Sequence, residues 1–199
     1  MSTPFTNPLV PSAIPPFNQS GVLPPYVGSD PTQQAGVSPY EATLTELVLR
    51  FGTSAQRRDI LDGFLNHRSA LIGLGIHGLQ WLDGSFVESV ETDQQRSPND
   101  IDVVTFFIRP AHLIQLADWQ AFLQANPTIF VPPLAKTQFR TDPYFVDVTF
   151  GPLHVIEQTA YWSSLFSHQR VTGLWKGMIK VGLDPQRDDA NARRVLGTL

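Results

Sequence analysis

Three groups of residues have the types and spacing to do chemistry on a charged ligand. Asp100 and Asp102 head the run IDVVTFFI, Asp147 interrupts the run YFVDVTF, and Gly84-Ser85 follows the apolar run GLQWL. Side chains two apart in a strand share a face, so Asp100 and Asp102 would repel each other unless a cation lay between them. Oxygen ligands favour Mg²⁺ or Mn²⁺, which are used for displacement at phosphorus. The pair therefore predicts a metal site for phosphoryl chemistry.

Asp147 and the Gly84-Ser85 pair could complete this site. A carboxylate in the otherwise apolar YFVDVTF run would be unfavourable if it were buried without a partner. Beside the central strand, Asp147 would bind a second ion or accept a proton from an attacking hydroxyl. Gly84 lets the backbone approach a ligand closely, and the N–H groups around it, with the Ser85 hydroxyl, can hold phosphate oxygens.

Each of these features also has a purely structural alternative. The glycine-serine pair could be an ordinary turn from a strand into a loop, and the two clustered aspartates could cap loop backbone. Asp147 could instead form a salt bridge within its strand, with Arg140 or Lys180 as the partner. Their joint occurrence in this order favours the functional interpretation.

Basic residues near the C-terminal end are candidates for phosphate contacts. Lys176 and Lys180 have the spacing that places both on one face of a strand, and with Arg170 they could bind phosphate; a plain surface strand is the alternative. From residue 169 onward there are six basic and three acidic residues, in a chain of net charge −4. A short anionic ligand could bind there, whereas the overall charge argues against a protein that holds long nucleic acid.

The elements that must position these residues alternate between strands and helices. Strands are predicted at 78–82, 101–108, 144–150 and 175–181, and helices at 38–50, 54–73, 110–125 and 154–166, with another opening at Asp184-Pro185. The run at 101–108 is β-branched and aromatic, which is typical of a central strand covered on both faces. We therefore expect an α+β fold in which helices pack on a mixed central sheet.

A proline-rich extended arm is predicted over residues 1–37, ahead of a domain spanning residues 38–199. Residues 1–40 contain nine of the 17 prolines and one charged side chain, Asp30. Apolar residues spread along the arm favour docking onto a surface after residue 12, whereas disorder and docking are equally compatible with residues 1–12. Docking onto a neighbouring copy would make the protein a homo-oligomer.

Composition excludes several classes of protein. A hydrophobic content of 42% excludes wholesale disorder. The sequence has no apolar run of 18 residues and no apolar leader after a basic start, so we expect neither a membrane span nor a secretory signal. The absence of cysteine excludes disulfide bonds and thiolate zinc sites and suits a reducing compartment, which we expect to be the cytoplasm.

The order of these motifs resembles the signature of the DNA polymerase β-like nucleotidyltransferase superfamily. The closest resemblance is to a family of uncharacterised bacterial nucleotidyltransferase-like proteins, through the segments PPFNQSGVLPPYVG, LDGSFV, SPNDIDVV, YFVDVTF and KGMIKV. The resemblance implies a nucleotidyltransferase-like fold in which Asp100 and Asp102 bind Mg²⁺ or Mn²⁺. It also implies that Asp147 supports the nucleophile and that Gly84 and Ser85 hold the triphosphate.

The reaction implied by this resemblance is transfer of a nucleotidyl group from an NTP, such as ATP, to a protein or small-molecule hydroxyl. Pyrophosphate leaves, and proximity and charge neutralisation do most of the catalytic work. A cognate partner protein would fit a bacterial toxin–antitoxin or defence system. The alternative is a catalytically inactive module of the same fold that binds a nucleotide or a partner protein.

Overall fold

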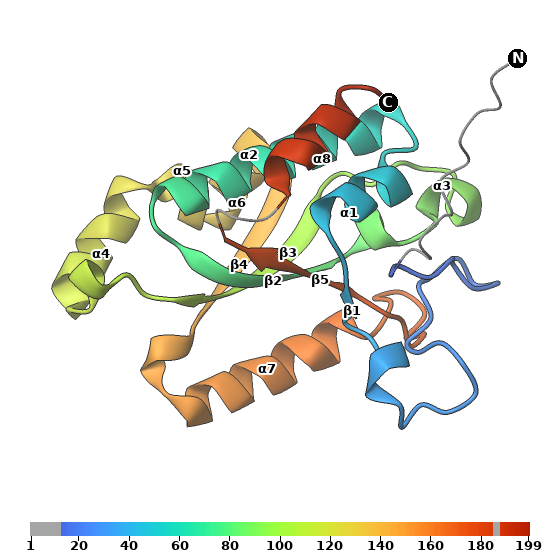
Figure 1. Ribbon diagram of the computed structural model, residues 1–199, viewed down its shortest axis with the longest axis horizontal. Helices are drawn as coiled ribbons and strands as arrows, with labels where there is room; N and C mark the ends of the chain where they lie inside the picture. The colour runs from blue at the N-terminus through green and yellow to red at the C-terminus, as the bar shows by residue number, and fades with distance from the viewer. Residues whose placement is uncertain (1–12, 185–187) are drawn as a thin grey trace, which may run out of the picture.

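Residues 13–184 and 188–199, the part of the chain that the computed structural model describes, form a five-stranded mixed sheet with helices on both faces (Figure 1). The strands are β1 (Tyr40–Glu41), β2 (His77–Asp83), β3 (Ile101–Ile108), β4 (Thr141–Asp147) and β5 (Ile179–Leu183). Their order across the sheet is β1-β5-β2-β3-β4. β2 runs antiparallel to β3 and β5, whereas β1 with β5 and β3 with β4 are parallel. The expected α+β fold with a mixed sheet is confirmed.

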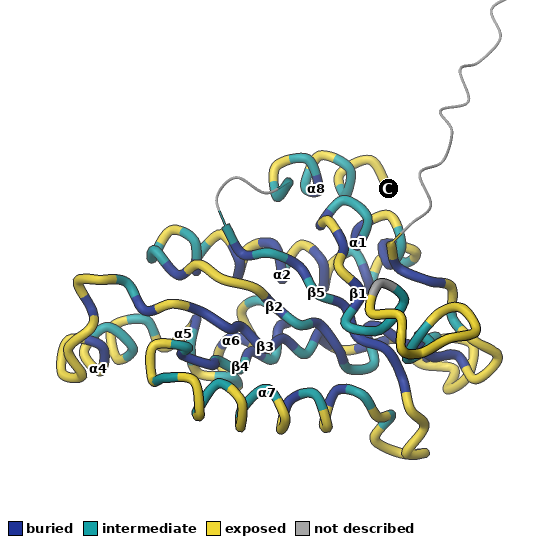
Figure 2. The backbone as a smooth tube through the Cα atoms, turned by 60° about the horizontal axis from the view of Figure 1, so that its bottom comes forward, coloured by how far each residue is buried: buried dark blue, intermediate teal, exposed yellow. Residues whose placement is uncertain are grey.

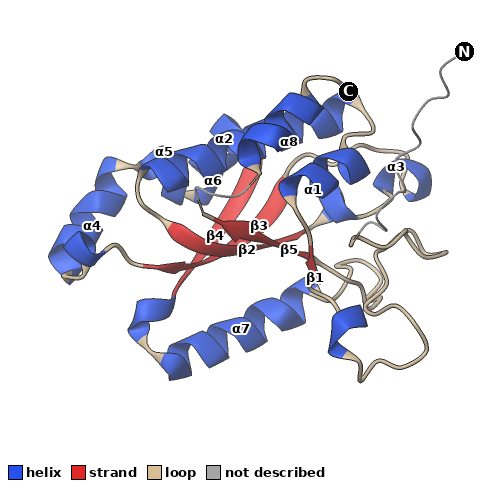
Figure 3. Cartoon of the chain, in the orientation of Figure 1, coloured by secondary structure: helices blue, strands red, loops and turns tan. Residues whose placement is uncertain are grey.

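Helices pack on the two faces unequally (Figure 3). One face is covered by α1 (Leu44–Phe51), α2 (Ala55–Gly73), α4 (Leu116–Ala125), α5 (Pro127–Phe130), α6 (Pro132–Phe139) and α8 (Asp189–Leu196), and the other by α7 (Pro152–Phe166). The short elements are α3 (Val90–Asp93) and the 3₁₀ turns η1 (Gln34–Gly36), η2 (Ser85–Val87), η3 (Ala111–Leu113) and η4 (Val148–Phe150). Within the described ranges, no helix combines the length and apolarity that crossing a membrane requires.

The side chains of β3 alternate between two packed layers. Val103 belongs to the cluster that contains Leu65 of α2, whereas Val104 packs in the cluster that contains Trp162 of α7. β3 is therefore covered on both faces, as predicted, and the centre of the sheet is buried (Figure 2). Strand side chains alternate between the two faces of the sheet. Whether an aspartate lies at an even or an odd residue number in β3 or β4 therefore decides whether it faces α7 or the opposite layer.

The first predicted helix begins later than expected. It starts at Leu44, where the Thr43 side chain accepts a hydrogen bond from Glu46 N and the Glu46 carboxylate accepts one from Thr43 N at 2.8 Å. This capping box satisfies two free N–H groups. The expectation of a start at Ser38 was wrong because β1, which follows it, pairs with β5 from the far end of the chain.

Other predicted elements exist with different bounds. β4 covers residues 141–147 rather than 144–150, β5 begins at Ile179 rather than Trp175, and the helix expected over 110–125 is η3 followed by α4. α5 and α6 were not predicted. The last helix, α8, begins at Asp189, and Pro185 of the predicted start lies outside the described residues.

The described part of the N-terminal arm, residues 13–37, packs against the chain's own domain. Ile14 and Leu23 are buried in the core cluster under α1 and α2. Gly177 N donates to Leu23 O at 2.8 Å, and Ser89 N donates to Gly21 O at 2.8 Å. The docking expected after residue 12 is therefore intramolecular in this segment, while residues 1–12 lie outside the described residues.

Candidate functional site

Three aspartates form a row across neighbouring strands. The register pairs Asp83 of β2 with Asp102 of β3, and Asp102 with Asp142 of β4. Each is two residues from a side chain that packs in the α7 layer, so all three point to that face of the sheet. Asp100 lies one residue before β3 and two residues before Asp102, so it points to the same face, and it lines one cavity together with the three aspartates. Four carboxylates therefore gather at one end of the sheet.

The carboxylates line a cavity of about 870 Å³ between the sheet and the C-terminal half of α7. Its lining also includes Gly84, Ser85, Arg96, Lys136, Tyr144, Tyr161, His168, Arg170 and Lys176. Most of the residues predicted from the sequence, namely the Asp100 and Asp102 pair, the glycine-serine turn, Arg170 and Lys176, are thus brought together around one space.

Asp147 does not belong to this cluster. It pairs with Phe107, at the opposite end of the β3–β4 register from Asp102, and its odd position turns it to the opposite face of the sheet. Arg109 Nε donates to Asp147 Oδ2 at 2.8 Å, and both side chains are buried. The expected convergence of Asp147 with the other carboxylates is wrong. The salt-bridge alternative describes its position, with Arg109 as partner in place of Arg140 or Lys180.

Asp142 stands where Asp147 was expected. Asp142 was not among the predicted site residues because the strand was expected to begin at Tyr144, whereas β4 begins at Thr141 and includes Pro143. β4 is the last strand in the sheet order, and an edge strand tolerates a proline whose missing N–H faces away from its neighbour. The available signal was the even spacing of Asp142 from Tyr144 and Val146, which share its face.

The turn after β2 brings backbone close to the carboxylate row. Gly84 has φ +80° and ψ −166°, a left-handed conformation that favours glycine. A Cβ at this position would lie 1.8 Å from Asp102 Oδ2. Gly84 therefore permits both the turn and the approach of Asp102, and Ser85 opens η2 at the wall of the cavity.

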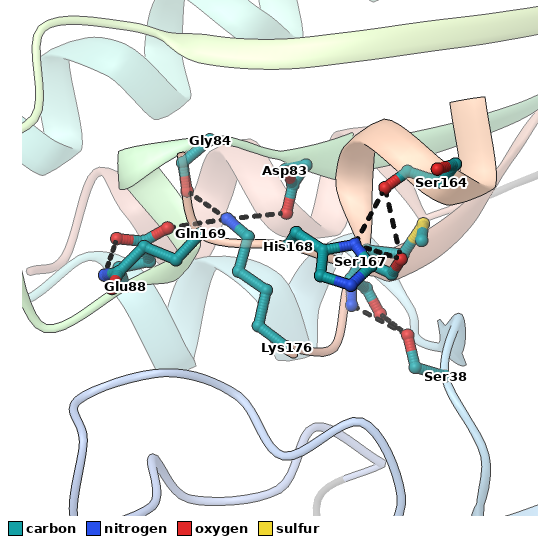
Figure 4. A network of polar contacts seen from close by, with 10 residues as sticks. Ser38, Asp83, Gly84, Glu88, Ser164, Ser167, His168, Gln169 and Lys176 are labelled. Atoms are coloured by element: carbon teal, nitrogen blue, oxygen red, sulfur yellow. Dashed lines mark hydrogen bonds and ion pairs between the residues drawn. The ribbon is translucent and has the colours of Figure 1, made fainter. Parts of the chain in front are cut away.

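Lys176 supports this turn from within the protein. Its Nζ lies 3.1 Å from Asp83 Oδ1 and 2.6 Å from Glu88 Oε1, and it donates to Gly84 O at 3.4 Å (Figure 4). Lys176 is 2% exposed and Asp83 4%. Gln169 Nε2 donates to the other Glu88 oxygen at 2.8 Å. The ammonium predicted to contact phosphate thus already has two carboxylate partners, which hold it beneath the turn.

A second lysine, Lys136 of α6, reaches the carboxylates from another side. Its Nζ forms an ion pair with Asp100 Oδ2 and lies 3.4 Å from Asp142 Oδ2. The Lys136 side chain is 48% exposed, so it contacts the carboxylates from the solvent side. Lys136 was not among the predicted site residues, because the eight-residue helix that carries it was not predicted.

Burial and mutual repulsion perturb two of the carboxyl groups. Burial raises the pKa of Asp83 to about 7, although Lys176 opposes the shift. Burial raises the pKa of Asp102 to about 6, with further contributions from the charges of Asp100 and Asp142. Charge density of this kind is typical of sites that bind a cation or move a proton.

The carboxylate oxygens of the row are the type of donor that a hard divalent cation such as Mg²⁺ or Mn²⁺ prefers, although their present arrangement among the described residues does not form a metal site. The Asp102 carboxylate accepts no hydrogen bond from any described residue. In the described ranges, no group of three or more carboxylate or imidazole side chains is arranged to hold a metal ion, and the Lys136 ammonium lies among the carboxylates.

The remaining predicted residues are divided between the cavity and other contacts. Lys180 lies outside the cavity lining, and its Nζ is 3.0 Å from Glu41 Oε2. Arg170 lines the cavity. Tyr161 and Trp162 both line the cavity from α7. Tyr161 is 57% exposed, whereas Trp162 is buried and packs against Tyr144, with ring centroids 4.6 Å apart. Of these two aromatic side chains, only that of Tyr161 is accessible to a ligand.

Residues 15–182 match the model of a family of unknown function, DUF6932. The matched range contains the carboxylate row, the glycine-serine turn and both lysines that contact the carboxylates. No curated protein matches the chain.

Proposed function

The chain belongs to DUF6932, a family of unknown function, and we propose that its site transfers a nucleotidyl group from a nucleoside triphosphate to a protein or small-molecule hydroxyl. The observation that supports this most is the row Asp83, Asp102 and Asp142, in register on one face and beside the Gly84-Ser85 turn. Carboxylates in this number beside an open cavity suit binding of a metal-complexed triphosphate.

The proposed ligands of Mg²⁺ or Mn²⁺ are Asp100, Asp102 and Asp142. When bound, the ion supplies neutralisation of negative charge at the reacting phosphate and on the leaving pyrophosphate. The backbone N–H groups around Gly84 and the Ser85 hydroxyl hold phosphate oxygens. Among the described residues, the guanidinium groups of Arg96 and Arg170 line the same cavity and are available to the triphosphate tail.

In the proposed step, the acceptor hydroxyl oxygen forms a bond to the α-phosphorus as the bond from that phosphorus to its bridging oxygen breaks. Pyrophosphate leaves with the electron pair, and the hydroxyl proton passes to a carboxylate oxygen of the row. The chain contributes chiefly position and charge. The net charge of −4 favours a protein or small-molecule acceptor over a long nucleic acid.

The direct test is incorporation of label from each of the four NTPs, labelled at the α-phosphate, with Mg²⁺ or Mn²⁺ and a panel of hydroxyl acceptors that includes the protein itself. We expect transfer that is abolished in Asp102→Asn and Asp142→Asn. Asp147→Asn is the matched control, because it makes the same chemical change outside the cavity and should retain transfer per folded molecule. Transfer that survives both cavity substitutions would overturn the proposal.

A second candidate function is nucleotide binding without turnover, and the position of Lys136 among the carboxylates favours it. Calorimetric titration with each NTP, with and without Mg²⁺, combined with an assay for pyrophosphate release, separates the two functions. Binding without release in the presence of every acceptor supports this second candidate, whereas release that depends on Asp102 supports the first.

A further inference from the structure

We infer that Lys136 is a tethered competitor of the divalent cation, an ammonium that occupies the space between Asp100 and Asp142 and leaves when the ion binds. The inference rests on the proposed function, since it concerns the same carboxylates. It adds a regulatory contact that couples arrival of the metal to release of a lysine from the cavity wall.

The geometry places the Lys136 ammonium where a cation is needed. Its Nζ pairs with Asp100 Oδ2, an oxygen that is inaccessible to solvent and has no hydrogen-bond partner among the described residues beyond this ion pair. The same Nζ lies 3.4 Å from Asp142 Oδ2. An ion bound to these two oxygens would carry a double positive charge within contact distance of the ammonium. Both cations therefore cannot remain at these oxygens together.

Lys136 also differs from the other lysines in its freedom to leave. The chain has three lysines. Lys176 is 2% exposed and fixed beneath the turn, and Lys180 pairs with Glu41 away from the carboxylates. The Lys136 side chain is 48% exposed on the short helix α6, so its flexible stem can move the ammonium into water without opening the core.

A second space next to the site gives the released ammonium room to move. Lys136 lines both the carboxylate cavity and a cavity of about 730 Å³ on its other side. Asp59 and Asp62 line this second cavity. Arg58, Arg140 and Arg193 line it as well, and Arg193 lies 3.8 Å from Asp62. The second cavity therefore gives the Lys136 stem a solvent-filled space to turn into, and water rather than a new carboxylate pair receives the ammonium.

The first experiment measures Mn²⁺ affinity by calorimetry and by electron paramagnetic resonance of free Mn²⁺, without nucleotide and at one fixed pH. The proteins are wild type, Lys136→Met and the control Lys180→Met. We expect Lys136→Met to bind Mn²⁺ about 3- to 10-fold more tightly than wild type, and Lys180→Met to remain within about twofold. Equal or weaker binding by Lys136→Met would overturn the inference.

The second experiment follows Lys136 in the wild-type protein by acetylation with a small amine-reactive reagent and mass spectrometry. Saturating Mg²⁺ should raise the labelling rate of Lys136 several-fold relative to that of Lys180. An unchanged rate at a Mg²⁺ concentration shown to be bound would overturn the inference.

The two proposals fail in different ways. Equal Mn²⁺ affinity in wild type and Lys136→Met contradicts the competition by Lys136 but does not affect the proposal of nucleotidyl transfer. Tighter Mn²⁺ binding by Lys136→Met, with no nucleotidyl transfer by any of the proteins under any condition, supports the competition and contradicts the proposed activity. Absence of Mn²⁺ binding by wild type and Lys136→Met alike overturns both.

Discussion

The Asp102 carboxylate lies so close to the backbone of Gly84 that a Cβ at residue 84 would come within 1.8 Å of Asp102 Oδ2. Gly84 also has φ +80°, a backbone angle that residues other than glycine rarely adopt. The absence of a side chain at this position is thus required twice, once by the turn and once by the carboxylate. The conformation of the turn and the geometry of the candidate metal site are therefore linked.

Gly84→Ala should weaken Mn²⁺ binding at least about 10-fold and lower the free energy of unfolding by about 2 to 3 kcal/mol, because strain in the turn adds to displacement of Asp102. The matched control is Gly28→Ala, since Gly28 has φ +91° and no neighbour within 4 Å of its added Cβ. The control should show only the backbone penalty of about 1 kcal/mol and unchanged Mn²⁺ affinity. Equal effects of the two substitutions would contradict the linkage.

Asp142→Asn and Asp147→Asn should have opposite consequences. Asp147 forms a buried ion pair with Arg109, so Asp147→Asn should lower the free energy of unfolding by about 3 kcal/mol by leaving the guanidinium unpaired, with Mn²⁺ affinity retained. Asp142→Asn should abolish Mn²⁺ binding with a change in stability below about 1 kcal/mol. Chemical denaturation and Mn²⁺ titration of both variants check this, and Mn²⁺ binding that depends on Asp147 would contradict the assignment.

The elements that the sequence predicted best are those with a continuous local pattern. The β-branched run of β3 and the cap at Ser54 with the apolar periodicity of α2 come from neighbouring residues. Asp100, Asp102 and the glycine-serine turn were found in the same way, because a strand brings them to its own end. These features need no knowledge of which strands become neighbours.

The parts of the fold and of the site that were not predicted depend on which distant segments of the chain pair with each other. Asp142 and Asp147 are both candidates on one strand, and only the register with β3 places Asp142 beside Asp102. The Lys136 contact depends on α6, a short helix with two prolines and no clear apolar period. β1 forms because β5 pairs with it across most of the chain's length. Tertiary contacts, rather than local propensity, determined these parts.

Lys176→Met should be among the most destabilising single substitutions of the site. It leaves the buried carboxylates of Asp83 and Glu88 without their shared cation, and we expect a loss of about 3 to 5 kcal/mol in the free energy of unfolding. The double variant Lys176→Met with Glu88→Gln removes one uncompensated charge and should recover part of this loss. Urea denaturation of the three proteins measures it. A double variant less stable than Lys176→Met would show that Glu88 is not the source of the destabilisation.

The raised pKa of Asp102, about 6, predicts how the metal-free protein responds to pH. The folded state holds a proton on this carboxyl that the unfolded state releases near pH 4, so its contribution to stability is complete below about pH 4 and is lost as pH rises through 6. Asp102→Asn should therefore be more stable than wild type by about 1 to 2 kcal/mol at pH 7.5 in EDTA, and equally stable at pH 3.5. A constant difference between these pH values would contradict the shift.

His67 predicts an acid response of the opposite sign, far from the carboxylate row. Its Nε2 lies 2.9 Å from Ile129 O in a fully buried environment beside the rings of Phe139 and Phe145, and burial lowers its pKa to about 4. The unfolded state takes up a proton near pH 6.5, so the contribution of neutral His67 is complete above that pH and is lost as pH falls towards 4.

Between pH 7 and pH 5, the wild-type protein should therefore lose about 1 to 2 kcal/mol of unfolding free energy more than His67→Phe does, because phenylalanine cannot take up the proton in the unfolded state. The control is His77→Gln, which removes a histidine from an exposed position away from this buried cluster. Denaturation by urea at each pH gives the values. If His67→Phe keeps the wild-type pH dependence over this range, the buried imidazole does not control acid stability, and the titrating group must be sought elsewhere.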